Sequence, residues 1–163
     1  MNKIHKKFLD IFARYLILIL ASLPSLWIFY FVFTPLTIYP VFYILGIFFD
    51  AILIKNVVVI NNQVPIELIR SCIAGSAYYL LLVLNMSLPN IKLGKRIKMI
   101  LISFAALLLI NILRIVLLSY IFLESFTIFV AAHQFLWYFM STIFVVAIWF
   151  SEVKFFKIKE IPF

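Results

Sequence analysis

Long apolar runs dominate this sequence and restrict its possible folds more than any other feature. They cover approximately residues 8–33, 36–54, 66–88, 99–123 and 129–150. A helix that crosses a bilayer needs about 20 mostly apolar residues. A soluble domain of 163 residues, 67% of them hydrophobic, cannot bury this much apolar surface. The sequence therefore predicts an all-α polytopic membrane protein with about five apolar helices, forming a single domain over residues 1–163.

The first run follows the basic segment MNKIHKK, so it is either a signal peptide or a retained helix. We favour a retained transmembrane helix because the run is longer than a signal-peptide core and no clear small-residue cleavage site follows it. Pro24 lacks a backbone donor and predicts a kink. Asp10 and Arg14 lie four residues apart and are expected to pair. Residues 34–40 contain two prolines and predict a short connection to the second run.

A change of pattern after the second run predicts a small β-hairpin before the third helix. Residues 57–60 and 63–66 are two short β-prone stretches on either side of Asn61 and Asn62. Asparagine tolerates positive φ and favours such a turn, and Pro65 requires an edge position in the sheet. An open hairpin within hydrocarbon would leave backbone groups unpaired. We therefore expect it at the extracytoplasmic surface or packed against protein.

Loop charge predicts the orientation of the chain in the membrane. The segment 90–98 carries four basic residues and no acid, so it is predicted to be cytoplasmic, as is the basic tail. Five crossings would then place Lys3, Lys6 and Lys7 outside, against the positive-inside rule. An internal N-terminus would instead require one of the first two runs to be re-entrant or interfacial. The length of both runs favours five crossings, and the sequence leaves both arrangements open.

Cys72 is the single cysteine and the first candidate for chemistry. One cysteine excludes an intrachain disulfide and a multi-cysteine metal site. It lies near the predicted start of the third helix, where the helix dipole and Arg70 favour a reactive thiolate. The small residues 74–77 allow close packing of helices or close approach of a substrate. The alternative is a buried structural cysteine, which behaves as a small hydrophobic residue.

Arg114 and His133 are ionisable residues in the next two apolar runs. An arginine within a membrane helix costs about 2.5–3.5 kcal/mol on insertion scales and usually faces an interior with a function. Asn111 lies on the same helix face and is expected to support it. A histidine can act as general base to the Cys72 thiol and as general acid to a leaving amine. The alternatives are a snorkelling or structurally paired arginine and an interfacial histidine.

Other classes of site lack support in the sequence. No HExxH pattern, paired carboxylates or glycine-rich phosphate loop is present, so we predict neither a metal nor a cofactor. The net charge of +8 is concentrated at the ends and in one loop. This pattern indicates anionic lipid headgroups rather than nucleic acid.

Three motifs in this order resemble the exosortase/archaeosortase family. They are SCIAGSAYYLLLVLN with Cys72, NILRIVLL with Arg114, and AAHQFLWYF with His133, on successive helices. The resemblance covers roughly residues 36–150, with a catalytic core of about 56–150. The small size and the Lys/Ile/Asn-rich character are most similar to the short archaeal members of the pacearchaeosortase type.

The resemblance implies a membrane-embedded cysteine transpeptidase or protease in the cell membrane, with its active site toward the extracytoplasmic face. Its substrates would be surface proteins with C-terminal sorting signals, which consist of a short motif, a transmembrane helix and a basic tail. Cys72 would form the thioacyl intermediate, His133 would transfer protons, and Arg114 would stabilise the oxyanion or orient the thiolate. A lipid amine would then accept the acyl group.

A second function remains open on the residues alone. Arg114 and His133 would also suit a polar path in a small, non-enzymatic transport or assembly subunit. A transporter usually has more helices or an inverted repeat, and neither is visible here. The two functions differ at Cys72, because an enzyme would lose its activity on Cys72→Ala and a transporter would tolerate the change.

Overall fold

The computed structural model describes residues 3–23, 25–89, 91–137 and 141–158, which are mostly helical with a small sheet. The helices are α1 (Lys3–Ser22), α2 (Trp27–Phe48), α3 (Arg70–Ile73), α4 (Gly75–Ser87), α5 (Leu93–Glu124), α6 (Phe126–Phe135) and α7 (Ser141–Phe155). The strands are β1 (Ala51–Ile54), β2 (Val57–Ile60) and β3 (Val64–Glu67).

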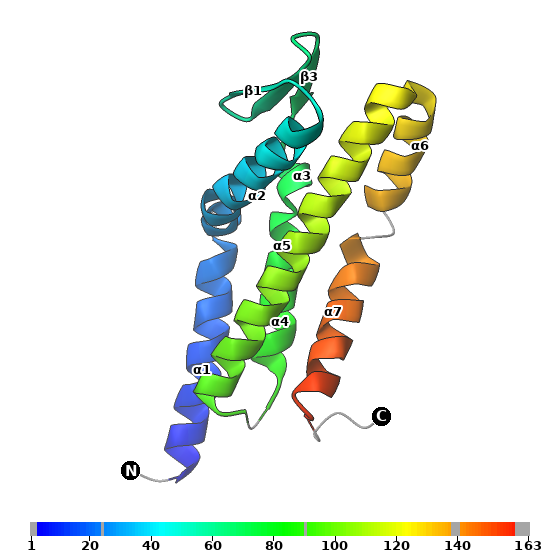
Figure 1. The fold of residues 1–163 in the computed structure, drawn as a ribbon. Helices are drawn as coiled ribbons and strands as arrows, with labels where there is room; N and C mark the ends of the chain where they lie inside the picture. The colour runs from blue at the N-terminus through cyan, green and yellow to red at the C-terminus, as the bar shows by residue number, and fades with distance from the viewer. Residues whose placement is uncertain (1–2, 24, 90, 138–140, 159–163) are drawn as a thin grey trace.

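The helices run along the length of the molecule between two ends (Figure 1). Helices α1 and α2 follow one another toward the sheet, α3 and α4 return, α5 runs back up, and α6 and α7 descend. The sheet and the α5–α6 turn therefore form one end, which we call the sheet end. The start of α1, the α4–α5 connection and the end of α7 form the other, which we call the basic end.

The N-terminal half differs from the sequence-based prediction. The chain breaks between α1 and α2, where Ser25 and Leu26 adopt positive φ, next to the predicted kink at Pro24, which is outside the described residues. The predicted connection at residues 34–40 is wrong, because α2 continues through both prolines of this segment. Prolines are tolerated in membrane helices, where neighbouring groups can satisfy the freed backbone carbonyls. Helices α1 and α2 thus lie in series rather than as a returning pair (Figure 1).

Two of the described helices, α2 and α5, are long and apolar enough to cross a membrane. Their outer faces carry exposed apolar side chains, such as Phe31 on α2 and Leu109 and Leu113 on α5. Such a continuous apolar exterior is unusual for a soluble monomer and supports the predicted membrane location. Helix α5 begins at Leu93, earlier than the predicted residue 99, so part of the basic loop forms its first turns.

Aromatic packing joins α2, α4 and α5 in the middle of the molecule. The rings of Phe33 and Tyr78 stack with their centroids 3.6 Å apart. Phe104 of α5 meets both rings edge-on at 5.5 Å. Tyr78 is fully buried, and Phe33 nearly so. This cluster holds α4 between α2 and α5. It thereby fixes where the segment that precedes α4 lies along the length of the molecule.

The sheet is antiparallel with the order β1-β2-β3. The predicted hairpin is present as β2 and β3, and Asn61 and Asn62 at its turn both have positive φ. Pro65 lies on the edge strand β3, opposite Val59, as predicted. Strand β1 was predicted as the end of the second helix, and this was wrong. A short apolar run fits either a strand or a buried helix, and pairing with β2 decided for the strand.

The sheet packs against the helices through its central strand. Val58 and Ile60 of β2 are fully buried. They belong to one apolar cluster with Ile38 and Val41 of α2 and Ile115 of α5. The sheet is therefore held over the ends of α2 and α5, and the chain that leaves β3 enters the helix bundle directly beside α5.

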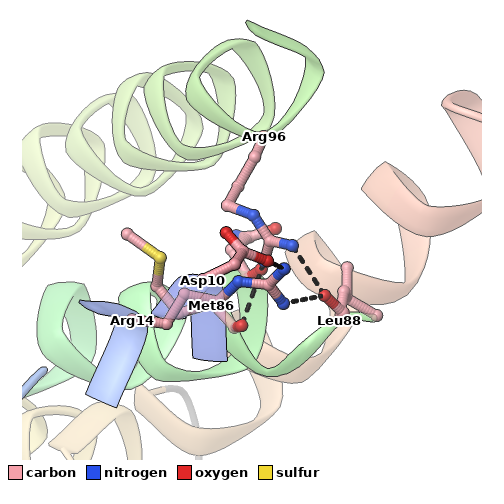
Figure 2. A network of polar contacts seen from close by, with 6 residues as sticks. Asp10, Arg14, Met86, Leu88 and Arg96 are labelled. Carbon is pink, nitrogen blue, oxygen red and sulfur yellow. Dashed lines mark hydrogen bonds and ion pairs between the residues drawn. The ribbon is translucent and has the colours of Figure 1, made fainter. Parts of the chain in front are cut away.

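Arg96 caps the end of α4 at the basic end (Figure 2). Its buried guanidinium donates hydrogen bonds to the backbone carbonyls of Asn85, Met86 and Leu88. These belong to the last turn of α4 and the residue after it, where a helix leaves its carbonyls without intrahelical donors. One side chain at the start of α5 thus satisfies the end of the preceding helix.

Arg14 connects α1 to the same place (Figure 2). Its guanidinium donates to the Leu88 carbonyl at 3.2 Å and pairs with Asp10, as predicted from their spacing. Higher on α1, the Leu18 carbonyl accepts a hydrogen bond from the Tyr79 hydroxyl. Helix α1 is therefore attached to α4 by polar contacts at two heights.

Arg96→Ala is expected to lower the free energy of unfolding by about 2–4 kcal/mol, because it removes charge-assisted hydrogen bonds from three carbonyls, two of them in buried bonds. Unfolding of the purified protein in mixed micelles by a denaturing detergent would measure this. Lys98→Ala is the matched control, since Lys98 is an exposed cation two residues after Arg96 on α5. Equal stability of the two variants would show that the cap contributes little.

Candidate functional site

The third predicted helix, over residues 66–88, is interrupted at the sheet end. Its first two residues belong to β3, and Leu68 extends the sheet by donating from its backbone to the Asn56 carbonyl. A single helical turn, α3, follows, and the helix then breaks at Ala74, which has φ 59° and ψ 37°. This left-handed conformation costs an alanine about 1–2 kcal/mol. It persists where the surrounding structure holds the backbone in place.

Close packing of α2 accompanies this break. A Cβ at Gly75 would lie 2.8 Å from the ring of Tyr30, so only glycine fits without displacing that ring. Arg70 places its guanidinium over the same ring, 5.5 Å from the centroid. The prediction that small residues after Cys72 allow close packing is thus confirmed at Gly75. The Tyr30 ring thus lies close to both ends of α3, to Arg70 at its start and to Gly75 two residues after its end.

Cys72 lies in this isolated turn and is half-buried. Its backbone N–H donates to the Ile69 carbonyl at 2.9 Å, and its own carbonyl accepts from the Asn111 side-chain amide at 2.8 Å. Asn111 was predicted to support Arg114, but its amide holds Cys72 instead. A four-residue turn also has a much smaller dipole than a long helix, so the predicted dipole effect on the thiol is largely lost.

The α5–α6 turn brings His133 back beside Arg114. Helix α5 ends at Glu124 and α6 begins at Phe126, with Ser125 alone between them in an extended conformation. The rings of Phe122 and Phe129 meet edge-on across the turn, 4.9 Å apart. Arg114 is eleven residues before Ser125 and His133 eight after it, so at 1.5 Å per residue their levels differ by only about 5 Å.

The predicted fifth helix, over residues 129–150, corresponds to two recorded helices, α6 and α7. Helix α6 ends at Phe135 and α7 begins at Ser141, with residues 138–140 outside those described. Helix α6 packs against the upper part of α5, whereas α7 contacts both α4 and α5. The predicted range therefore has different packing partners in its two described parts.

Cys72, Arg114 and His133 line one pocket of about 210 Å³ at the sheet end. Residues 65–69, which leave the sheet, form one wall, α5 forms the floor, and Phe129 of α6 closes the opposite side. The lining is mainly apolar. Residues from three separate apolar runs therefore meet around one space, and their catalytic roles stay predictions.

Arg114 is the cationic side chain of this pocket, which Glu67 also lines. It interacts electrostatically with both Cys72 and His133. Its Nε is buried and has no hydrogen-bond partner, and within the described ranges no carboxylate forms an ion pair with it. A guanidinium without a bound acid is available to an anion or a developing oxyanion. Within the described residues, no structural ion-pair partner of Arg114 is present.

His133 faces the pocket one helical turn after Phe129, whose ring lies 5.4 Å from the imidazole, centroid to centroid. In the part of the chain that the structure describes, no hydrogen bond joins Cys72, Arg114 and His133 to one another. The three side chains thus line the space separately. Catalytic hydrogen bonds often tighten only when a substrate group lies between the partners.

Neither the described side chains nor known proteins identify a metal site or a family for this chain. Among the described residues, no group of three His, Cys, Asp or Glu side chains is placed to hold a metal ion. No protein-family model, curated protein or solved structure matches this chain. The chemistry of the pocket residues is therefore the available guide to function.

Sequence reasoning missed the contribution of Asn111 to the position of Cys72. A polar residue three positions before Arg114 in an apolar helix was the available signal. Its target could not be inferred, because the break at Ala74 that turns the Cys72 carbonyl toward α5 leaves no clear mark in the sequence.

Asn111→Leu is expected to increase the alkylation rate of Cys72 severalfold, because loss of the hydrogen bond lets α3 open more often. A small maleimide measures this directly, since Cys72 is the single cysteine. Ser119→Ala is the control, because Ser119 lines the same pocket but bonds only to Ile115 within its own helix. An unchanged rate in Asn111→Leu would show that this amide does not restrain the turn.

Proposed function

We propose that this protein is a membrane-embedded cysteine transpeptidase or protease that cleaves C-terminal sorting signals of surface proteins. The observation that carries the proposal is the shared pocket of Cys72, Arg114 and His133. A nucleophile, a group that can transfer protons and a cation that can stabilise an oxyanion are the parts needed for acyl transfer. The resemblance of the three sequence motifs to exosortases and archaeosortases supports the same chemistry.

In the proposed first half-reaction, His133 takes the proton from the Cys72 thiol as the sulfur attacks the scissile carbonyl carbon. The carbonyl oxygen becomes an oxyanion, which the Arg114 guanidinium stabilises. The C–N bond then breaks, and His133 returns the proton to the leaving amine. The products are a thioester on Cys72 and the released C-terminal segment.

In the second half-reaction, an amine attacks the thioester carbonyl and His133 accepts its proton. Collapse of the tetrahedral intermediate forms the new amide, and the Cys72 sulfur leaves and regains a proton from His133. A membrane lipid with an amino headgroup is the proposed acceptor. Water in place of the amine would give hydrolysis by the same steps.

A four-pass arrangement fits the charge distribution. With α1 and α2 in series, the basic N-terminus, the segment 92–98 and Lys154 all belong to the basic end (Figure 1). The positive-inside rule then assigns the basic end to the cytoplasm, and the conflict with five crossings disappears. The pocket and the sheet would face the extracytoplasmic side, where a surface protein would be processed.

The second candidate is a non-enzymatic transport or assembly subunit in which Arg114 and His133 line a polar path. The pocket is mostly apolar, which gives this function less support. It also assigns no role to Cys72 or to the Asn111 hydrogen bond that holds it.

Co-expression with a candidate surface protein that ends in a transmembrane helix and a basic tail tests the proposal. Wild type is expected to remove the tail, as shown by the mass of the product. Cys72→Ala is expected to abolish processing, and Arg114→Leu and His133→Gln to reduce it by about 100-fold or more. The product mass also distinguishes lipid attachment from hydrolysis.

Gln134→Ala serves as the control for His133→Gln, because Gln134 is its exposed neighbour on the same helix. Ser119→Ala serves for Arg114→Leu, as a pocket residue on the same helix without a proposed role. Processing by Cys72→Ala at the wild-type rate would exclude Cys72 as the nucleophile and favour the non-enzymatic alternative.

A further inference from the structure

A second buried polar cluster lies between α4, α5 and α7, nearer the basic end. The Asn85 amide donates to Glu152 Oε2 at 3.1 Å and to Ser103 Oγ at 3.4 Å. Asn85 is fully buried and Glu152 is only 4% exposed. Ser103 precedes Arg114 by eleven residues on α5, or about 16 Å along the helix axis, so this cluster is separate from the catalytic pocket.

This cluster has acceptor atoms without donors. Glu152 Oε1 and Asn85 Oδ1 are both buried, and neither has a hydrogen-bond partner. Two cations at this end of the bundle have other acceptors, since Arg96 donates to backbone carbonyls and Lys95 donates to the Phe156 carbonyl at 2.8 Å. A buried carboxylate is expected to have a cationic partner. The described residues supply none, and a basic group from another molecule would satisfy both acceptor atoms.

A groove leads to this carboxylate. Glu152 and Ser103 line a space of about 520 Å³ between α5 and α7, whose other walls are mostly apolar. Ala106, Ala147 and Ser151 are small, which allows the backbone of a neighbouring helix to approach closely. The groove has the character of a helix-docking site with one buried charge at its lower end.

The groove continues toward the catalytic pocket. A smaller space of about 20 Å³ shares Ile110 and Phe144 with the groove and Arg114 with the catalytic pocket. These shared lining residues show that the groove, the small space and the catalytic pocket follow one another along α5. A helix that lies in the groove along α5 would have one end on the side of Arg114.

We propose that the α5–α7 groove binds a transmembrane helix of a partner protein through a lysine or arginine side chain that pairs with Glu152. The inference rests on the proposed function, in which this partner is the substrate and its chain continues upward from the groove to the scissile peptide at Cys72. A basic side chain is proposed because its charge is complementary to that of Glu152. A helix is proposed because the small residues of the groove allow close approach of a helix backbone.

Cysteine crosslinking tests this binding without any catalysis. In a Cys72→Ser background the chain has no cysteine, and Ala147→Cys then places a single thiol in the groove. The probe is a synthetic Leu/Ala transmembrane helix with one cysteine and a lysine five residues after it, matching the separation of Ala147 and Glu152 along α7. Copper-catalysed disulfide formation in vesicles is then quantified.

The lysine-bearing helix is expected to crosslink about fivefold more than a helix with leucine at that position, the ratio expected for one polar contact between membrane helices. Glu152→Gln is expected to remove this preference. Val146→Cys is the control, because Val146 is exposed on α7 outside the groove. The lysine and leucine helices are compared on the same protein, so this part of the test remains valid if Glu152→Gln does not fold.

Equal crosslinking of the lysine and leucine helices would overturn the proposal. An aminolipid that co-purifies with the wild type and is lost in Glu152→Gln, together with equal crosslinking, would assign the groove to lipid instead. Because the assay uses Cys72→Ser, absence of peptide processing in co-expression would refute the proposed function without affecting this result, and the reverse also holds.

Discussion

The structure depends on the way in which α5 satisfies the backbone of the segment that packs beside it. In an apolar environment an unpaired carbonyl is costly, and an interrupted helix has several. Asn111 donates to the Cys72 carbonyl at the upper break, and Arg96 donates to carbonyls at the lower end of α4. These two side chains lie fifteen residues apart on α5, about 22 Å along its axis. One long helix therefore provides the donors for both ends of α3 and α4.

The break that this arrangement permits creates the pocket. The single turn α3 leaves the sheet at an angle, and the space between β3, α5 and α6 remains open. The sheet is part of this geometry, because its buried strand β2 anchors the chain above α5. The position of the cysteine thus follows from a backbone conformation that an alanine adopts only under restraint.

Polar residues divide the length of α5 into three regions with different partners. Arg96 is bound to the α4 terminus, Ser103 belongs to the Asn85–Glu152 cluster, and Arg114 has no bound acid. Among the described residues, the first donates to three carbonyls, the second has acceptor atoms without donors, and the third has no acidic partner. A saturated group contributes to stability, whereas groups with unfilled hydrogen-bonding capacity are those available to a ligand. By this criterion the two upper regions are the ones that suit a substrate.

The sequence by itself determined the apolar helical character, the hairpin turn at Asn61 and Asn62, the Asp10–Arg14 pair and the identity of the three candidate residues. Each depends on local composition or on spacing within one element. Tertiary structure alone decided that α2 runs through Pro35 and Pro40, that residues 51–54 form a strand and that the helix breaks beside Cys72. It also decided that Asn111 reaches Cys72 and that Glu152 faces a groove. These features depend on which residues distant in sequence supply the missing donors and packing surfaces, and hydrophobic periodicity carries no information about that.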